Sequence, residues 1–305
     1  MNKMFRKFFY YLFNEPSILG IAVLLRLSTI LPDKWYLKLM FRLKMGYWMD
    51  FKNPKTFNEK LQWLKLYNRN SEYIKMVDKL AVKEYVASVI GEEYIIPTLG
   101  VWNRPEDIDF ENLPEKFVLK TTHGGGSNGV VVCGDKSKLD KAKVMSKLCD
   151  SMRQNIYSTF KEWPYKDVLP RIIAEQYLED AETKELRDYK FFCFNGCAEY
   201  YKVDFDRFVG HRANYFDRNG LLMKFGEEVC PPDYNKNIEM PDSVPYMIEL
   251  AEKLSKGIPF VRVDLYCVNK KIYFGEMTFF PAAGFGKFTD RQWDMKLGDL
   301  ISLEI

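Results

Sequence analysis

A glycine-rich segment between two runs of strand-forming residues constrains this chain more than any other feature. Residues 123–129 read HGGGSNG, with β-forming residues at 117–120 before them and at 130–133 after them. A dinucleotide-binding fingerprint or a serine hydrolase nucleophile elbow requires a helix after its glycines, so the following strand argues against both. The order strand, glycine loop, strand instead predicts a loop whose N–H groups reach phosphates, because glycine lets the backbone approach closely. A merely flexible hairpin loop is the alternative.

Composition sets broad limits on the class of protein. The 305 residues are 47% hydrophobic and 16% aromatic, which predicts a folded chain whose core needs no disulfides. The net charge of +3 is too small for the phosphate affinity of a nucleic-acid-binding protein, so no nucleic-acid partner is expected. Two histidines and six cysteines without a CxxC pair do not make a zinc module. We expect reduced thiols and a cytoplasmic protein.

Helical patterns occur in three places after residue 50. Thr56 and Glu59 form a capping box that opens a first helix. Apolar residues from Ile74 to Tyr85 recur at helical spacing and predict a second helix, closed by Gly91. A third helix is predicted between residues 241 and 257, starting at a proline and stopped by a glycine.

Strand patterns occur between and after these helices. Runs of β-branched and aromatic residues predict strands at 117–120, 130–133, 172–177, 189–194, 261–267 and 272–278. Asn195 and Gly196 tolerate the positive φ of a type I′ turn, so they predict an antiparallel hairpin after the fourth run. The last two runs form another hairpin. The chain is therefore expected to be an α/β protein of the α+β type.

The positive charge is concentrated at the N-terminus. Residues 1–60 contain eleven Lys and Arg but only four Asp and Glu. Within them, residues 1–13 are basic and aromatic, and the apolar run at 18–31 is interrupted by Arg26. That run is shorter than the roughly 20 apolar residues of a membrane span. Two alternatives remain: a helical hairpin packed on the main domain, or a helix lying in the headgroup plane of an anionic membrane.

Charged residues alternate along the two strands of the last hairpin. Alternation places Arg262 and Asp264 on one face of their strand, and Glu276 and Thr278 on one face of the next. If the loop is residues 269–271, Asp264 lies opposite Glu276 with Cβ atoms about 5 Å apart, whereas a two-residue loop would separate their faces. Opposed carboxylates repel each other, and a bound Mg²⁺ removes that conflict. Two solvated carboxylates on an exposed hairpin are the alternative.

Asp204 and Asp206 form a separate D-x-D motif. It resembles the metal and nucleotide-sugar motif of many glycosyltransferases, in which both carboxylates share a metal with a diphosphate. A polar loop or the wall of an active site is the alternative, because two Asp residues at this spacing are common by chance.

The order of these motifs resembles the nucleotide site of the ATP-grasp superfamily, with D-alanine:D-alanine ligase as the nearest pattern. The resemblance rests on VDKLAVK around Lys79, Lys120 before the glycine loop, EQYL at 175–178, RVD at 262–264 and EMT at 276–278. NPKTFNEK at 53–60 and DYKFFCFNG at 188–196 are similar to the TupA-like branch, found in gene clusters for surface polysaccharides. The resemblance covers approximately residues 50–290.

The resemblance implies a domain plan and a set of site residues. It implies an ATP-grasp core at 115–305, made of a glycine-loop subdomain (115–178) and a metal and catalytic subdomain (179–305), whose antiparallel sheets grip ATP. An N-terminal helical extension (1–50) and an α/β part (51–114) would precede it. The implied ATP contacts are Lys79, Lys120, Gly124, Gly125, Gly126, Ser127, Gly129, Glu175, Gln176, Tyr177, Leu178, Asp188 and Lys190.

The resemblance also assigns the metal and the catalytic groups. Asp264, Glu276 and Thr278 would surround Mg²⁺, although many ATP-grasp enzymes have Asn where Thr278 stands. Arg262 would face the reacting carbonyl, and Lys120 would act on the transferring phosphoryl group.

The implied activity is ATP- and Mg²⁺-dependent ligation of a carboxylate to an amine through an acylphosphate. The implied substrates are an amino acid or amine and a uronic-acid sugar or glycan precursor. Candidate anion contacts, or ordinary surface charges, are Arg187, Lys190, Lys202, His211 and Arg212. The alternatives are a metal-dependent glycosyltransferase using the D-x-D motif and a non-catalytic, membrane-associated glycan-binding protein. The expected location is the cytoplasm, peripheral to the inner face of the membrane.

Overall fold

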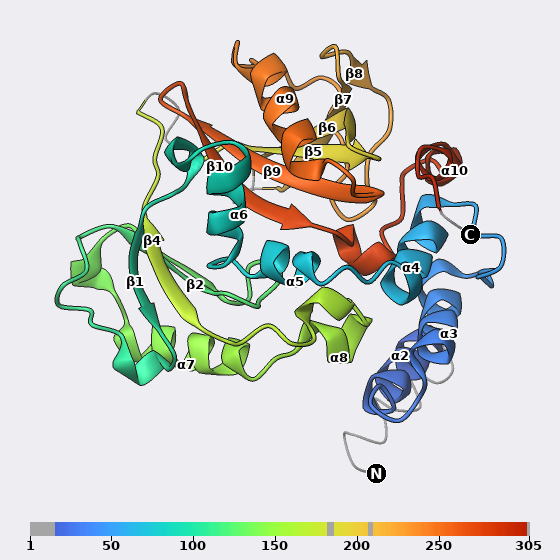
Figure 1. Ribbon diagram of the computed structural model, residues 1–305, viewed down its shortest axis with the longest axis horizontal. Helices are drawn as coiled ribbons and strands as arrows, with labels where there is room; N and C mark the ends of the chain where they lie inside the picture. The colour runs from blue at the N-terminus through green and yellow to red at the C-terminus, as the bar shows by residue number, and fades with distance from the viewer. Residues whose placement is uncertain (1–15, 182–185, 207–209, 304–305) are drawn as a thin grey trace.

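The computed structural model describes residues 16–181, 186–206 and 210–303 and has two antiparallel sheets with helices packed around them (Figure 1). The expected mixed α/β class is therefore confirmed. The basic aromatic stretch at 1–13 lies outside the described residues.

The first sheet has four strands and carries the glycine loop. Its order is β1 (Thr98–Trp102), β4 (Ile172–Gln176), β2 (Phe117–Thr121) and β3 (Val130–Cys133), all antiparallel. Phe117 and Leu119 are buried against α7 (Lys141–Met152), so the alternate residues Val118 and Lys120 face the other side. The strands predicted at 117–120, 130–133 and 172–177 are confirmed to within one residue.

The second sheet has six strands and carries the acidic residues. Its order is β10 (Lys271–Thr278), β9 (Phe260–Val268), β5 (Asp188–Phe194), β6 (Cys197–Phe205), β7 (Arg212–Asp217) and β8 (Leu222–Met223). Helix α9 (Val244–Ser255) covers one face and starts three residues after Pro241, which lies in a preceding turn. The predicted hairpin between β5 and β6 is confirmed, with φ of 49° at Asn195 and 85° at Gly196.

The predicted helix between Ile74 and Gly91 is wrong, because the chain breaks it in two. Helix α5 (Glu72–Val77) ends at Asp78, whose backbone is extended, and α6 (Val82–Val89) begins four residues later. The Asp78 carboxylate accepts hydrogen bonds from the N–H groups of Leu80 and Ala81 and pairs with Arg171 at 2.7 Å. The break places Lys79 in a short connection rather than on a helix face.

The predicted three-residue loop of the last hairpin is also wrong, yet the predicted pairing is present. The β9–β10 turn contains only Asn269 and Lys270, with φ of 49° and 64°. A bulge at Gly275 then shifts the register by one residue and sets Glu276 opposite Asp264. A Cβ at Gly275 would lie 3.0 Å from the Asp264 carbonyl oxygen, so any larger residue at the bulge would need the neighbouring strand to shift by a few tenths of an ångström.

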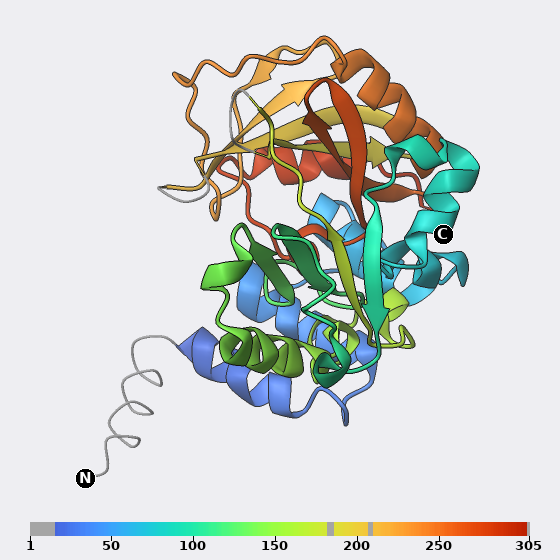
Figure 2. The ribbon, with the colours of Figure 1, turned by 90° about the vertical axis from the view of Figure 1, so that its left-hand side faces the viewer.

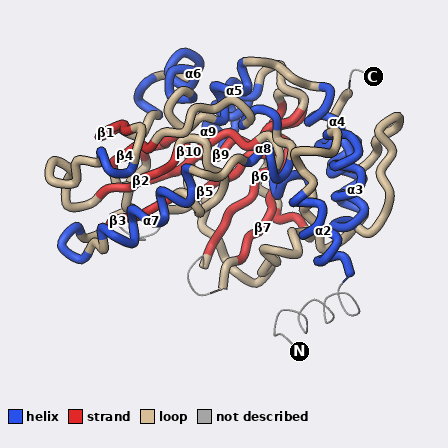
Figure 3. Tube along the Cα trace, turned by 90° about the horizontal axis from the view of Figure 1, so that it is seen from below, coloured by secondary structure: helices blue, strands red, loops and turns tan. Residues whose placement is uncertain are grey.

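Helix α4 (Phe57–Tyr67) begins with the predicted capping box and contacts α10 (Gln292–Asp299). N-terminal to it, α2 (Pro16–Arg26) and α3 (Asp33–Met45) form a hairpin whose inner side packs on Trp63 and Phe285. In Figure 3 this hairpin lies at the opposite end of the molecule from β1 and β3. The described part of the N-terminal segment thus has the helical hairpin that was one of the two alternatives. None of the described helices combines the length and apolar character that a membrane span needs.

Candidate active site

Residues from both sheets line a cavity of about 300 Å³. The first sheet contributes Val118 and Lys120 of β2, and the second contributes Tyr266 of β9. The adenine-site candidates Gln176, Tyr177 and Leu178 complete one wall together with Glu175. The structure therefore brings the predicted adenine segment and Lys120 to one cavity between the sheets.

An ion triad is centred on the buried Glu175, and two of its members, Lys120 and Glu175, line this cavity. Glu175 lies 2.6 Å from Lys120 and 2.6 Å from Lys83. Burial opposes the ionised form of Glu175, but the two lysines outweigh it and hold the pKa of this carboxyl below its usual range. Lys83 was not among the sequence candidates, although its position four residues after Lys79 was visible in the sequence.

Glu175→Gln is expected to destabilise the protein by about 2 kcal/mol at pH 7, since it leaves two partly buried lysines without their shared carboxylate. A lowered pKa in the folded state means that this stabilisation is present above the unfolded pKa near 4.5 and is lost as the pH falls through the folded value. Urea unfolding of both proteins at pH 7 and pH 3 measures it. An equal difference in stability at the two pH values would contradict the assignment.

The glycine loop is tied to the break between α5 and α6. The Lys79 N–H donates to the Thr122 carbonyl at 3.0 Å, and its ammonium donates to the Gly124 carbonyl. A Cβ at Gly129 would lie 2.0 Å from Thr121 Oγ1, so glycine is required where the loop returns to the sheet. The backbone carbonyl of Ser127 accepts a hydrogen bond from the Val130 N–H, which closes a turn at the end of the loop without using the Ser127 side chain.

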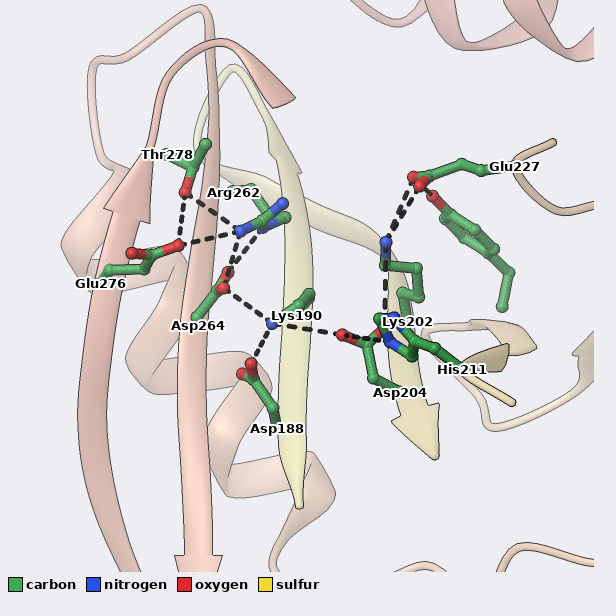
Figure 4. A network of polar contacts seen from close by, with 11 residues as sticks. Asp188, Lys190, Lys202, Asp204, His211, Glu227, Arg262, Asp264, Glu276 and Thr278 are labelled. Carbon is green, nitrogen blue, oxygen red and sulfur yellow. Dashed lines mark hydrogen bonds and ion pairs between the residues drawn. The ribbon is translucent and has the colours of Figure 1, made fainter. Parts of the chain in front are cut away.

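The side chains of Asp264, Glu276 and Thr278 converge on the guanidinium of Arg262 (Figure 4). One nitrogen of Arg262, Nη2, lies 2.7 Å from Asp264 Oδ2, 3.1 Å from Glu276 Oε1 and 3.1 Å from Thr278 Oγ1. The guanidinium thus supplies the positive charge that opposed carboxylates need. Carboxylate and hydroxyl oxygens are the ligands that Mg²⁺ prefers, so the donor set of Asp264, Glu276 and Thr278 fits the ion.

The pKa values of the two carboxylates of this cluster, Asp264 and Glu276, are shifted in opposite directions. Burial raises the pKa of Asp264 above its usual range, despite Arg262 and Lys190. Burial also opposes ionisation of Glu276, but Lys79, Arg262 and Lys190 outweigh it and hold its pKa below the usual range. Lys79 therefore acts electrostatically on the metal-site candidates as well as contacting the glycine loop.

Lys190 joins the cluster to its neighbours on the sheet. Its ammonium contacts Asp188 on the same strand and lies 3.0 Å from Asp264 and 3.6 Å from Asp204. Burial lowers the pKa of a lysine, but Asp188 and Asp264 reverse this and raise the pKa of Lys190 above its usual range. The two predicted nucleotide contacts Asp188 and Lys190 are thus brought to the candidate metal site.

The two residues of the D-x-D motif both line the smaller cavity of about 300 Å³, but their neighbouring side chains come from different elements. Asp204 is buried and lies 3.5 Å from His211 Nε2, whereas Asp206 lies 3.1 Å from Lys236. Lys202 is buried and lies 3.1 Å from Glu227, and the exposed Arg212 donates to the Pro232 carbonyl. The candidate anion contacts Lys202, His211 and Arg212 therefore lie on the β6–β7 side of the sheet.

Residues 59–302, which are most of the chain, match the family described as TupA-like ATPgrasp. The chain belongs to this family. No curated protein sequence matches it.

Solved structures of several ligases resemble this TupA-like ATP-grasp chain at low identity. D-alanine-D-alanine ligase from Helicobacter pylori is 14% identical, with 80% of this chain and 69% of that chain covered and a TM-score of 0.44. D-cycloserine synthetase DcsG is 13% identical, with 74% and 69% covered and a TM-score of 0.42. D-alanine-D-alanine ligase from Bacillus anthracis complexed with ATP is 17% identical, with 74% and 63% covered and a TM-score of 0.39.

A second cavity of the ATP-grasp chain, of about 830 Å³, was not foreseen from the sequence. Arg262, Glu276 and Thr278 lie in one part of its lining, together with Gly124, Gly125 and Gly126 of the loop. Lys44 of α3 and Arg153 after α7 supply further positive charge, while Phe160 and Phe280 supply apolar surface. Lys202, His211 and Arg212 are not among its lining residues. No local pattern pointed to Lys44 or Arg153, because only the tertiary fold brings α3 and α7 to this cavity.

Proposed function

We propose that this protein is an ATP- and Mg²⁺-dependent carboxylate–amine ligase that forms an amide through an acylphosphate. The observation that carries the proposal is the convergence of Asp264, Glu276 and Thr278 on Arg262 at the wall of the large cavity. The glycine loop borders the same cavity, so the loop proposed to bind phosphates and the acidic cluster line one space. Membership of the TupA-like ATP-grasp family supports it.

The nucleotide is proposed to bind in the smaller cavity. Gln176, Tyr177 and Leu178 would contact the adenine, and Lys79 and Lys120 would contact the phosphates under the glycine loop. Asp264, Glu276 and Thr278 would hold Mg²⁺, which when bound supplies positive charge to the phosphate oxygens.

In the proposed reaction, a substrate carboxylate oxygen attacks the γ-phosphorus, and the bond to the β-phosphate oxygen breaks to release ADP. The amine nitrogen then attacks the acyl carbon, the carbon–oxygen bond to phosphate breaks, and the nitrogen loses a proton. Arg262 would stabilise the oxyanion of the tetrahedral intermediate, since its guanidinium already lies in the cavity wall. No covalent bond to the enzyme is required.

The proposed substrates are an amino acid or amine and a uronic-acid sugar of a surface polysaccharide or its precursor. A cavity of about 830 Å³ has room for a sugar-sized ligand. Lys44 and Arg153 support an anionic ligand, because both add positive charge to its lining. The carboxylate and any linked phosphate of such a substrate would meet these groups.

The structure favours the ligase over the glycosyltransferase alternative. Asp204 and Asp206 line the smaller cavity, whose lining residues do not include those of the glycine loop. The acidic cluster at Asp264 instead lies beside the glycine loop and the large cavity.

Thermal unfolding with Mg²⁺ and different nucleotides tests the proposal. We expect ATP to raise the Tm and UDP-sugars to leave it unchanged; stabilisation by UDP-sugars alone would favour the transferase, and neither effect would favour a non-catalytic binder. Amine-dependent ADP release across a panel of uronic acids then identifies the substrates. Absence of ADP release with every pair, in a protein that binds ATP, would contradict the uronic-acid assignment.

Lys120→Ala is expected to weaken ATP binding by about 1.5 to 3 kcal/mol, the range for hydrogen bonds to charged groups. Lys83→Ala is the matched control, because Lys83 makes the same 2.6 Å ion pair with Glu175 but does not line the smaller cavity. Calorimetry with an ATP analogue measures both. Equal losses in the two variants would show that the ion triad, rather than a phosphate contact, sets the affinity.

Arg262→Lys is expected to lower amide formation by roughly tenfold or more while changing ATP binding less, because lysine keeps the charge but loses the planar donor fork. The donor fork is in use in this structure, since Nε and Nη2 of Arg262 both donate to Asp264 at 2.7 Å. Single-turnover ADP formation and product formation separate the two steps. A variant that loses ATP affinity and keeps its rate of amide formation would contradict the role.

A further inference from the structure

Exposed apolar side chains are concentrated on α2, α3 and the turns that flank them. Eight of the eighteen exposed large hydrophobic residues among the described parts of the chain lie within residues 16–48. These eight, which we call the α2–α3 platform, are Ile18, Val23, Leu25, Leu27, Ile30, Trp35, Leu39 and Trp48. Ile30 is 74% exposed, and Trp35 and Trp48 are 60% and 57% exposed. Exposed apolar side chains grouped on one helical hairpin are typical of an interaction surface.

Positive charge is interleaved with these apolar groups. Residues 16–48 contain five Lys and Arg and one Asp. The Lys38 ammonium lies 5.9 Å from the ring centroids of both Trp35 and Trp48, and the Arg42 guanidinium lies 6.0 Å from Trp48. Tryptophan with lysine and arginine is the composition of a surface that lies in an anionic headgroup layer. Lysine is depleted at protein–protein interfaces, so the composition favours lipid over a protein partner.

The inner side of the same hairpin is fixed to the body. Tyr36, Leu37, Met40 and Phe41 of α3 are fully buried, and Tyr36 donates to the Thr159 carbonyl at 2.7 Å. Figure 2 shows α2, in dark blue, along the lower edge of the molecule, with α3 between it and the rest of the fold. The platform is therefore held in a defined orientation.

We propose that the α2–α3 platform docks this protein on an anionic lipid bilayer and that its carboxylate-bearing acceptor is anchored in that bilayer. The second part rests on the proposed ligase function. Lys44 lies on α3, the helix that carries Trp35 and Leu39, and it lines the same cavity as Arg262 and Glu276. Docking through α3 therefore brings the wall of the acceptor cavity close to the headgroup layer.

Co-sedimentation of the full-length protein with vesicles tests the docking. The vesicles are phosphatidylcholine alone or phosphatidylcholine with 30% phosphatidylglycerol, a composition of about one anionic lipid in three. We expect binding to the anionic vesicles only, reduced by at least about tenfold in Trp35→Ser/Trp48→Ser. Leu221→Ser/Val229→Ser is the matched control, since these residues are 66% and 77% exposed on another part of the fold. It should bind as the wild type does.

Binding that is unchanged in the tryptophan variant would overturn the docking proposal, as would equal losses in both variants. Self-association that the tryptophan substitutions abolish, without vesicle binding, would identify a second copy of the chain as the occupant instead. Stabilisation by Mg²⁺-ATP is measured in the same samples. Stabilisation by Mg²⁺-ATP without vesicle binding overturns the docking proposal alone. Vesicle binding without stabilisation of the wild type by Mg²⁺-ATP overturns the ligase function alone.

The proposal that the acceptor is anchored in the bilayer is tested separately. The rate of ADP formation is compared between the active uronic acid free in solution and the same uronic acid coupled to a lipid in the anionic vesicles. We expect faster ADP formation with the coupled form, and a loss of that advantage in Trp35→Ser/Trp48→Ser. Equal rates with the two forms would overturn a membrane-anchored acceptor.

Discussion

Asp264→Asn and Glu276→Gln are each expected to lower Mg²⁺-dependent ADP formation by at least about a hundredfold, the scale for loss of one group that stabilises transition-state charge. The paired strand positions of these residues are the reason, because the bulge at Gly275 brings both carboxylates to the same nitrogen of Arg262. Either substitution removes one charged side chain from the proposed Mg²⁺ site. Steady-state ADP release as a function of Mg²⁺ concentration measures the loss.

Asp206→Asn is the control for this pair. Asp206 lies on the wall of the smaller cavity and pairs with Lys236 at 3.1 Å, so ADP formation is expected to stay within a few-fold of the wild type. An inactive Asp206 variant beside a fully active Asp264 variant would end the ATP-grasp site assignment and favour the glycosyltransferase.

The metal-free protein gives an independent measurement. The lowered pKa of Glu276 means that its ionised form stabilises the fold above pH 4.5, and that this contribution is lost as the pH falls through the folded value. Glu276→Gln is therefore expected to be slightly destabilising at pH 7 in the presence of EDTA. The carboxylate is 39% exposed, so solvent screening keeps the effect below about 1 kcal/mol.

Signals that depend on neighbouring residues were sufficient for much of the fold. The capping box at Thr56 and the turn at Asn195 and Gly196 specify their conformations through contacts within a few residues. The break after α5 had a local signal too, because Asp78 is a residue type that caps helices. The helical spacing of the apolar residues concealed it, and Arg171, which pairs with Asp78, comes from a distant part of the chain.

The pairing of Asp264 with Glu276 was predicted through two errors that cancel. The turn is one residue shorter than expected, which alone would place the carboxylates on opposite faces. The bulge at Gly275 restores the alignment, and the close approach of this residue to the Asp264 carbonyl is a cross-strand contact that the sequence does not show. Strand alternation therefore predicted the composition of the site, whereas its register depended on tertiary contacts.

The wall of the large cavity contains a segment of strained backbone that no sequence pattern indicated. Ala282 and Ala283 have φ of 48° and 54°, in the left-handed region that costs roughly 1 to 2 kcal/mol for each alanine. Both line the cavity. Lys65 of α4 holds this segment: its ammonium donates to the carbonyls of Ala283 at 2.8 Å and Phe160 at 2.9 Å.

Lys65→Met is expected to lower the free energy of unfolding by about 3 kcal/mol and to raise KM for the acceptor more than it lowers kcat. The side chain is fully buried, and burial lowers its pKa to about 7, so either protonation state still donates to these carbonyls. Methionine fills a similar volume but leaves the Phe160 carbonyl without its lysine donor and the Ala283 carbonyl with only the 3.3 Å bond from Gln62 Nε2, at about 1 to 3 kcal/mol for each lost bond. Chemical unfolding and acceptor titrations measure the two effects.

Ala283→Gly separates the strain from the lost hydrogen bonds. Glycine adopts the left-handed conformation without steric cost, so this variant alone is expected to be neutral or up to about 1 kcal/mol more stable than the wild type. In the Lys65→Met background the gain from Ala283→Gly should be smaller than in the wild type, because a segment that Lys65 no longer holds can relax and leaves less strain at residue 283 for glycine to relieve. Purely additive effects of the two substitutions would show that Lys65 stabilises the protein without holding this segment. An unchanged acceptor KM in Lys65→Met would place the segment outside the acceptor site.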